Sequence, residues 1–130
     1  FWGAIKIGAV PIPVNTLLTE KDYEYMLRDC RASILVVSAP LYEQFSSHLD
    51  SQPFVRHVVI AGGSSDDHPN LDTLIENATA DLQGAPTTCD DAAFWLYTSG
   101  STGTPKGAIH HQSDLVQTAE LYGKQTLGMT

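Results

Sequence analysis

The chain alternates between segments whose apolar residues recur every three or four positions and short runs that are apolar throughout. The first spacing places apolar side chains on one face of a helix, and a short unbroken run, such as residues 34–37, is typical of a strand buried on both faces of a parallel sheet. From these patterns we predict helices over about 1–7, 20–30, 40–49, 71–78 and 114–122, and strands over 34–37, 57–60, 93–97 and 107–111.

Polar residues at the helix starts sharpen these boundaries. Thr19 followed by Asp22 forms a capping-box pattern, so a helix should begin immediately after Thr19. Asn70 and Ser113 are expected to cap the helices that follow them. The helix after Thr19 is expected to bury one face, which consists of Tyr23, Met26, Leu27 and Cys30. In the helix after Ser113, the side chains expected to face the interior are Leu115, Ala119 and Tyr122.

The order of these elements predicts the fold class. Strand and helix alternate through the first sixty residues, which favours an α/β fold with a partial parallel sheet, flanking helices and right-handed crossovers. Gly8 ends the first helix, and the prolines of segment 9–15 favour an edge strand or a polyproline-like path. Segment 81–91 has the composition of a connector within one domain. We expect residues 1–130 to be part of a longer protein.

Charge and cysteine content exclude several classes of partner. Seven basic residues against fifteen acidic ones give a net charge of −8, so we expect neither nucleic acid nor a membrane surface as a partner. Segment 1–14 is apolar, but it is too short and too interrupted by Lys6 and prolines to span a bilayer. Cys30 and Cys89 lack a CxxC spacing, so we expect free thiols and a reducing, cytoplasmic location.

Residues 97–107, YTSGSTGTPKG, are the clearest candidate for chemistry. Such a composition can mark a flexible linker, but this segment lies between two apolar runs of strand length. Gly100 and Gly103 permit positive φ, so consecutive backbone N–H groups can form a concave anion-binding nest. Lys106 adds a compact positive charge that suits polyphosphate oxygens. The segment is not a Walker A loop, because Pro105 precedes the lysine and a glycine follows it.

This segment resembles the phosphate-loop signature of the acyl-adenylate-forming (AMP-binding) superfamily, which includes acyl-CoA synthetases, luciferases and the adenylation domains of peptide synthetases. Residues 8–38 also resemble the region of these enzymes that leads into a buried strand. More narrowly, segments 15–27, 91–107 and 118–127 resemble benzoate–CoA ligases and 4-hydroxybenzoate–CoA ligases. The resemblance covers nearly the whole chain. It implies that residues 1–130 are part of the large N-terminal domain of such an enzyme, with the C-terminal domain absent.

The resemblance implies an ATP-dependent acid–thiol ligase that converts an aromatic carboxylate through acyl-AMP to acyl-CoA, using ATP, Mg²⁺ and coenzyme A. It assigns phosphate binding to Thr98, Ser99, Gly100, Ser101, Thr102 and Gly103. Thr98 is also implied to help hold Mg²⁺, and Lys106 to be the catalytic residue that neutralises charge on the departing pyrophosphate. Gln112 departs from the family, in which a histidine is common at this position.

Other interpretations stay open. The chain is also compatible with an adenylating enzyme for a fatty acid or for a carrier-protein thiol, and with a nucleotide-binding module that performs no ligation. His110 and His111 point to opposite faces of a strand, which favours structural roles over a shared metal. Alternation along the strand likewise favours core packing for Trp95 and Tyr97.

Overall fold

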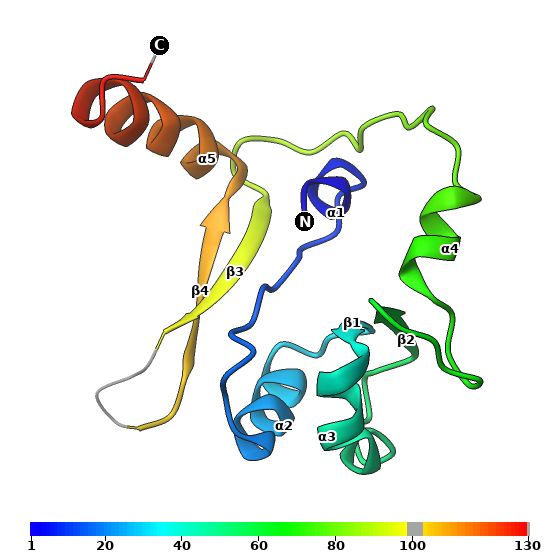
Figure 1. The fold of residues 1–130 in the computed structure, drawn as a ribbon. Coiled ribbons are helices and arrows are strands. Elements are labelled where there is room, and N and C mark those ends of the chain that lie inside the picture. The colour runs from blue at the N-terminus through cyan, green and yellow to red at the C-terminus, as the bar shows by residue number, and fades with distance from the viewer. Residues whose placement is uncertain (99–102, 130) are drawn as a thin grey trace. The chain divides into compact units, whose positions relative to one another are not determined.

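The computed structural model describes residues 1–98 and 103–129 (Figure 1). The chain forms two compact units, which we call the parallel unit, Asn15–Ala80, and the hairpin unit, made of Phe1–Val14 and Asp81–Thr130. Each unit contains one two-stranded sheet, parallel in the first unit and antiparallel in the second. Across the described part of the chain, no helix is long and apolar enough to cross a membrane.

A β–α–β arrangement forms the centre of the parallel unit. Strand β1 (Ile34–Ser38) runs parallel to β2 (His57–Ala61), with Ile34 opposite His57. Helix α3 (Ala39–Leu49) connects them, because two parallel strands can be joined only by a crossover. The predicted α/β class with a partial parallel sheet is confirmed.

Both helix caps predicted for the parallel unit are present. Helix α2 (Glu20–Asp29) begins after Thr19, whose hydroxyl accepts the Asp22 N–H at 3.4 Å while the Asp22 carboxylate accepts the Thr19 N–H at 3.1 Å. Helix α4 (Leu71–Glu76) begins after Asn70, whose side-chain oxygen accepts a first-turn N–H at 3.0 Å. These bonds satisfy backbone donors that the first turn of a helix otherwise leaves unpaired.

The core of the parallel unit lies on one face of its sheet. Its buried side chains are Tyr23, Val37, Val58 and Ile60, and the partly buried ones packed against them include Leu27, Leu35, Leu41 and Leu49. On the other face of β1, Ile34 is 58% exposed and Val36 is 54% exposed. The prediction that segment 34–37 is buried on both faces is therefore wrong for this chain, because α2 and α3 cover one face and leave these two side chains exposed.

The sheet of the hairpin unit is an antiparallel pair. Strand β3 (Ala92–Thr98) pairs with β4 (Lys106–His111), with a register shift near the start of β3. On the free edge of β3, the Trp95 N–H donates to the Pro11 carbonyl at 3.2 Å. The proline segment thus contacts the edge of β3 at this point without becoming a strand of its own.

The first helix of the hairpin unit ends where the sequence predicts. Helix α1 (Trp2–Lys6) is followed by Gly8, which has a φ of 76° and stops the helix in a left-handed conformation. The Lys6 carbonyl accepts the Ala85 N–H at 2.8 Å, so the connector is tied to the end of α1.

The last helix departs from the prediction. Helix α5 (Gln112–Thr118) has His111 as its N-cap, and the Asp114 carboxylate accepts the His111 N–H at 2.9 Å. Ser113 is therefore not the cap, because an acidic residue at the third helical position stabilises the earlier start. Helix α5 continues into the π-helix η1 (Ala119–Thr126), whose wider turns alter the helical phase. Ala119 is exposed and Tyr122 is 58% exposed, so the predicted inward orientation of both is wrong.

Candidate active site

The register of β3 and β4 brings the two ends of the candidate loop together. Thr98 ends β3, Lys106 begins β4, and the two residues are direct cross-strand partners. Directly opposite residues of an antiparallel pair share one face and have Cβ atoms about 4.5–5.5 Å apart. The Thr98 hydroxyl and the Lys106 side chain therefore leave the sheet on the same side. The other predicted phosphate ligands Ser99, Gly100, Ser101 and Thr102 lie outside the described residues.

Gly103 has the backbone conformation that the sequence predicts. Its φ is 81°, in the left-handed region that favours glycine. A Cβ built on Gly103 would meet nothing within 4 Å, so the conformation and not a lack of space accounts for this glycine. Left-handed residues of this kind are among the conformations from which anion-binding backbone nests are built.

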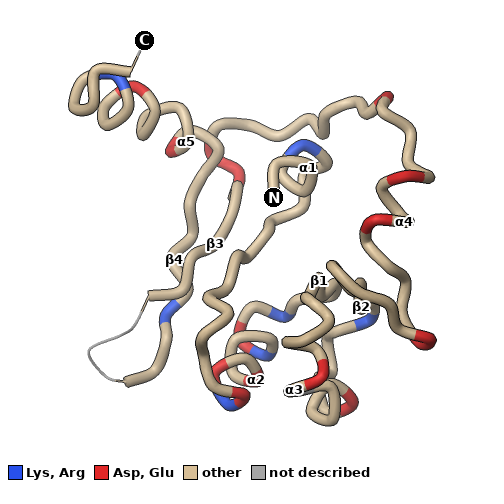
Figure 2. The backbone as a smooth tube through the Cα atoms, viewed as in Figure 1, with Lys and Arg blue, Asp and Glu red and all other residues tan. Residues whose placement is uncertain are grey.

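Lys106 dominates the charge of the hairpin. It is the only lysine, arginine, aspartate or glutamate in β3 and β4, and Figure 2 shows the basic colour where β4 begins. Its side chain is exposed and forms no ion pair with another described residue. An ammonium group without a carboxylate partner, next to a threonine hydroxyl, can donate hydrogen bonds to the oxygens of a phosphate.

Thr98 offers one oxygen to a metal ion. Mg²⁺ usually takes six oxygen ligands, so a single hydroxyl fits as one of its ligands and does not make a complete site. Within the two described ranges, no group of three or more His, Cys, Asp or Glu residues is arranged to hold a metal ion.

The two adjacent histidines of β4 have separate structural environments. The His110 ring stacks on the Phe94 ring, with centroids 4.5 Å apart and planes 6° apart. His110 Nδ1 also lies 3.7 Å from Asp114 Oδ2. His111 caps α5, and Gln112 is the first residue of that helix. These positions agree with the structural interpretation of both histidines.

Sequence reasoning missed a contact next to Lys106. A Cβ built on Gly107 would lie 3.2 Å from Trp95 Cε3 and 3.5 Å from Tyr97 Cζ. The Trp95 and Tyr97 rings are only half-buried, so the expected role in core packing accounts for part of their environment. The sequence does show two aromatic residues, Trp95 and Tyr97, at alternate positions of one strand. Their contact with Gly107 can be identified only once the antiparallel register is known.

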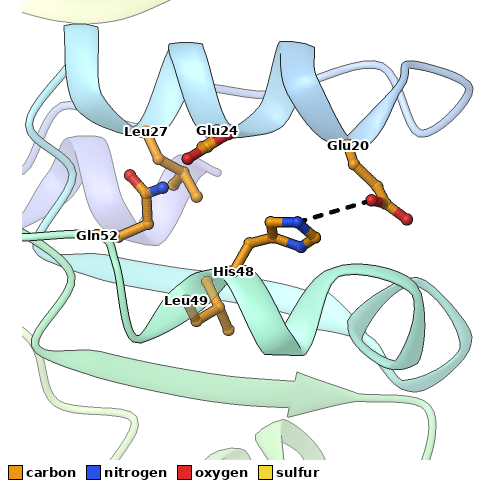
Figure 3. Close-up of a pocket in the computed structure, with 6 residues that line it drawn as sticks. All are labelled: Glu20, Glu24, Leu27, His48, Leu49 and Gln52. Atoms are coloured by element: carbon orange, nitrogen blue, oxygen red, sulfur yellow. Dashed lines mark ion pairs between the residues drawn. The ribbon is translucent and has the colours of Figure 1, made fainter.

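The parallel unit contains a second group of polar side chains, between α2 and α3 (Figure 3). His48 Nε2 lies 3.9 Å from Glu20 Oε2, and the buried Gln52 amide and Glu24 line the same hollow. This hollow has no room for a water molecule. It is a close contact between helices and not a ligand site.

The fold and the hairpin together define an α/β protein with a candidate phosphate-binding loop. Residues 1–129 match the family model of the AMP-binding enzymes, and the chain belongs to this family. The predicted superfamily is confirmed.

The similar proteins include CoA ligases of aromatic acids, and others among them are long-chain-fatty-acid–CoA ligases. The chain is 51% identical over 129 residues to the benzoate–CoA ligase of Thauera aromatica, a match that covers 99% of this chain and 24% of that protein. The crystal structure of the anthranilate CoA ligase AuaEII in complex with anthranoyl-AMP is similar with a TM-score of 0.90 and 35% identity, covering 95% of this chain and 24% of that one. A benzoate CoA ligase from Burkholderia xenovorans LB400 is similar with a TM-score of 0.83 and 37% identity, covering 100% of this chain and 24% of that one. The chain thus spans about a quarter of the length of these relatives.

Proposed function

We propose that a full-length protein containing this chain is an ATP-dependent acid–thiol ligase for aromatic carboxylates. The observation that carries the proposal is the 51% identity to a benzoate–CoA ligase over 99% of the chain. A similar structure in complex with anthranoyl-AMP supports an acyl-AMP intermediate. In the proposed reaction, a carboxylate oxygen attacks the α-phosphorus of ATP and pyrophosphate leaves. The thiolate of coenzyme A then attacks the acyl carbon, and AMP leaves.

The hairpin holds the phosphates that leave in the first step. Residues 98–103 bind the β- and γ-phosphates through hydroxyls and backbone N–H groups, and Lys106 neutralises the charge that develops on pyrophosphate. Bound Mg²⁺ supplies further positive charge to the phosphates, with the Thr98 hydroxyl as one of the groups that hold it. The position of Lys106 opposite Thr98, exposed and without a carboxylate partner among the described residues, supports these roles.

The first prediction concerns Lys106. Lys106→Ala in the full-length protein should slow benzoate-dependent ATP–pyrophosphate exchange by about 100-fold, because it removes one preorganised positive group from the developing charge. The thermal midpoint should change little, since the side chain is exposed. Lys21→Ala, which removes an exposed lysine of α2, is the matched control and should exchange at the wild-type rate. Wild-type exchange by Lys106→Ala would rule out the proposed role.

The second prediction concerns the acid. We expect the full-length protein to prefer benzoate or a simple ring-substituted benzoate over aliphatic acids, because a flat pocket gains ring burial and stacking that an alkyl chain does not supply. The measurement is kcat/KM for benzoate, 4-hydroxybenzoate, hexanoate and a long-chain fatty acid, each with ATP and coenzyme A. A higher value for either aliphatic acid would overturn the aromatic assignment and leave the broader adenylating reaction. Exchange of pyrophosphate without acyl-CoA formation would favour a carrier-protein acceptor.

A further inference from the structure

The two glycines on either side of Lys106 are present for different physical reasons. Gly103 needs a left-handed conformation, with a φ of 81°, and has open space where a side chain would be. Gly107 does not have a positive φ, so its backbone conformation is open to any residue. What limits a side chain at Gly107 is the space around it, because a Cβ there would require its neighbour to move by a few tenths of an ångström.

The aromatic side chains of β3 occupy that space. Tyr97 is the cross-strand partner of Gly107, and Trp95 lies two positions earlier on the same face of the strand. A Cβ on Gly107 would lie 3.2 Å from Trp95 Cε3, which is closer than side chains normally pack, whereas its distances to Tyr97 Cζ and Cε1 would be 3.5 and 3.6 Å, ordinary contact distances. Trp95 therefore sets the limit on size at position 107.

This limit bears directly on Lys106. Gly107 follows Lys106 in β4, and Lys106 leaves the opposite face of the strand toward the Thr98 side. A larger residue at position 107 must displace either the Trp95 ring or β4 itself. The backbone of β3 is bonded on both edges, to β4 and, through the Trp95 N–H, to the Pro11 carbonyl, whereas β4 pairs only with β3 among the described residues. Where the ring does not turn aside, the shift therefore falls on β4.

We propose that Trp95 is a positioning residue for Lys106: its ring closes over Gly107, holds β4 against β3 and so fixes the lysine opposite Thr98. The proposal rests on the proposed function, because its catalytic consequence requires that Lys106 meets the phosphates of ATP. Under this proposal, Trp95 contributes to the rate of adenylation as well as to the packing of the hairpin.

The test is a size series at position 107 in the full-length protein. Gly107→Ala should reduce kcat/KM for ATP in pyrophosphate exchange by about threefold to tenfold, and Gly107→Val by about 100-fold, because small displacements of a charged group away from the reacting atoms are costly. The KM for benzoate should stay constant, since the proposed function places Lys106 at the departing pyrophosphate and not at the acid. Gly3→Ala is the matched control, because a Cβ on Gly3 would meet nothing within 4 Å and its φ is not positive.

A second substitution separates positioning from general damage. Trp95→Leu removes the ring edge that limits position 107. Gly107→Ala should therefore cost much less activity in the Trp95→Leu background than it costs in the wild-type background. The proposal is overturned if Gly107→Ala and Gly107→Val exchange at the wild-type rate, or if the two changes simply multiply. A parallel increase in the KM for ATP and the KM for benzoate would also overturn the proposal.

The same variants distinguish failure of the positioning role of Trp95 from failure of the proposed function. If the wild-type protein exchanges no pyrophosphate with any acid, the proposed function fails. The thermal midpoints of the wild type, the two single variants and the double variant then decide the contact by itself: recovery of stability in the double variant supports the limit set by Trp95, and additive losses overturn it.

Discussion

At the scale of single residues, two exposed aspartates are held in their charged form by threonines three positions earlier. The pKa of Asp22 lies below its ordinary value of 3.8 because the Thr19 hydroxyl donates to its carboxylate at 2.6 Å and the Thr19 N–H at 3.1 Å. The pKa of Asp91 is lowered by the N–H of Thr88 at 2.6 Å and by its hydroxyl at 3.0 Å. These bonds fix the starts of α2 and of the turn before β3.

The third prediction follows from these bonds. Because both pKa values are lowered in the folded chain, each pair stabilises the fold above pH 3.8, and the contribution is lost as the pH falls through the folded-state pKa. Thr19→Val should raise the pKa of Asp22 toward 3.8 without moving that of Asp91, and Thr88→Val should do the reverse. Carboxyl ¹³C NMR titration of the 130-residue chain measures both. An unmoved pKa after loss of its own threonine would contradict the assignment.

At the scale of elements, the parallel pairing of β1 and β2 crowds the ends of both strands. The chain that leaves β2 passes the first residue of α3, so a Cβ built on Gly63 would lie only 2.5 Å from the Ala39 Cβ. The Asn70 side-chain amide donates to the Gly63 carbonyl while its oxygen caps α4. The connection from β2 to α4 is thus held at both ends.

The fourth prediction tests this crowding. Gly63→Ala should lower the free energy of unfolding by about 1–3 kcal/mol, because the new methyl group has no space. Adding Ala39→Gly should recover most of this loss, although glycine in the first turn of α3 has its own smaller cost. Urea unfolding of the 130-residue chain, followed by circular dichroism at concentrations where light scattering shows a monomer, measures both.

Gly84→Ala is the control for that comparison, since the nearest atom to a Cβ at position 84 is 3.8 Å away. Equal stability of Gly63→Ala and Gly84→Ala would contradict the crowding. A double variant no more stable than Gly63→Ala would show that Ala39 is not the cause.

At the scale of the whole molecule, the described surface retains much apolar area. Ile34 and Val36 lie exposed on one face of β1, and Ile109 of β4 is 51% exposed. Apolar side chains exposed together on one face of a strand favour association, and a two-stranded sheet also leaves most of its outer backbone groups without a partner strand.

The fifth prediction is that the 130-residue chain by itself forms no acyl-CoA and binds ATP weakly, because it offers phosphate contacts and little else to the nucleotide. It should also bind a hydrophobic dye and self-associate, and the double change Ile34→Thr and Val36→Thr should reduce both effects. Light scattering and dye fluorescence measure association, and a coupled assay measures acyl-CoA. Robust ligation by the isolated chain would contradict the prediction.

The features that depend on neighbours along the chain could be predicted from the sequence. The starts of α2 and α4 follow from Thr19 and Asn70, because a capping bond joins residues only three positions apart. Gly8 and Gly103 could be assigned left-handed conformations for the same reason, since backbone φ is a local property. The phosphate-loop candidate and its family were likewise readable from one continuous segment.

Contacts between residues far apart in the sequence could not be predicted in this way, because they depend on how the elements pack. The antiparallel register that places Lys106 opposite Thr98 and Gly107 beneath Trp95 depends on pairing between strands, and a shift by one residue would move every side chain to the other face. The exposure of Ile34 depends on which face α2 and α3 cover, because an apolar run looks the same whether one face or both are buried. Local sequence thus specified the elements, and long-range packing specified their faces and partners.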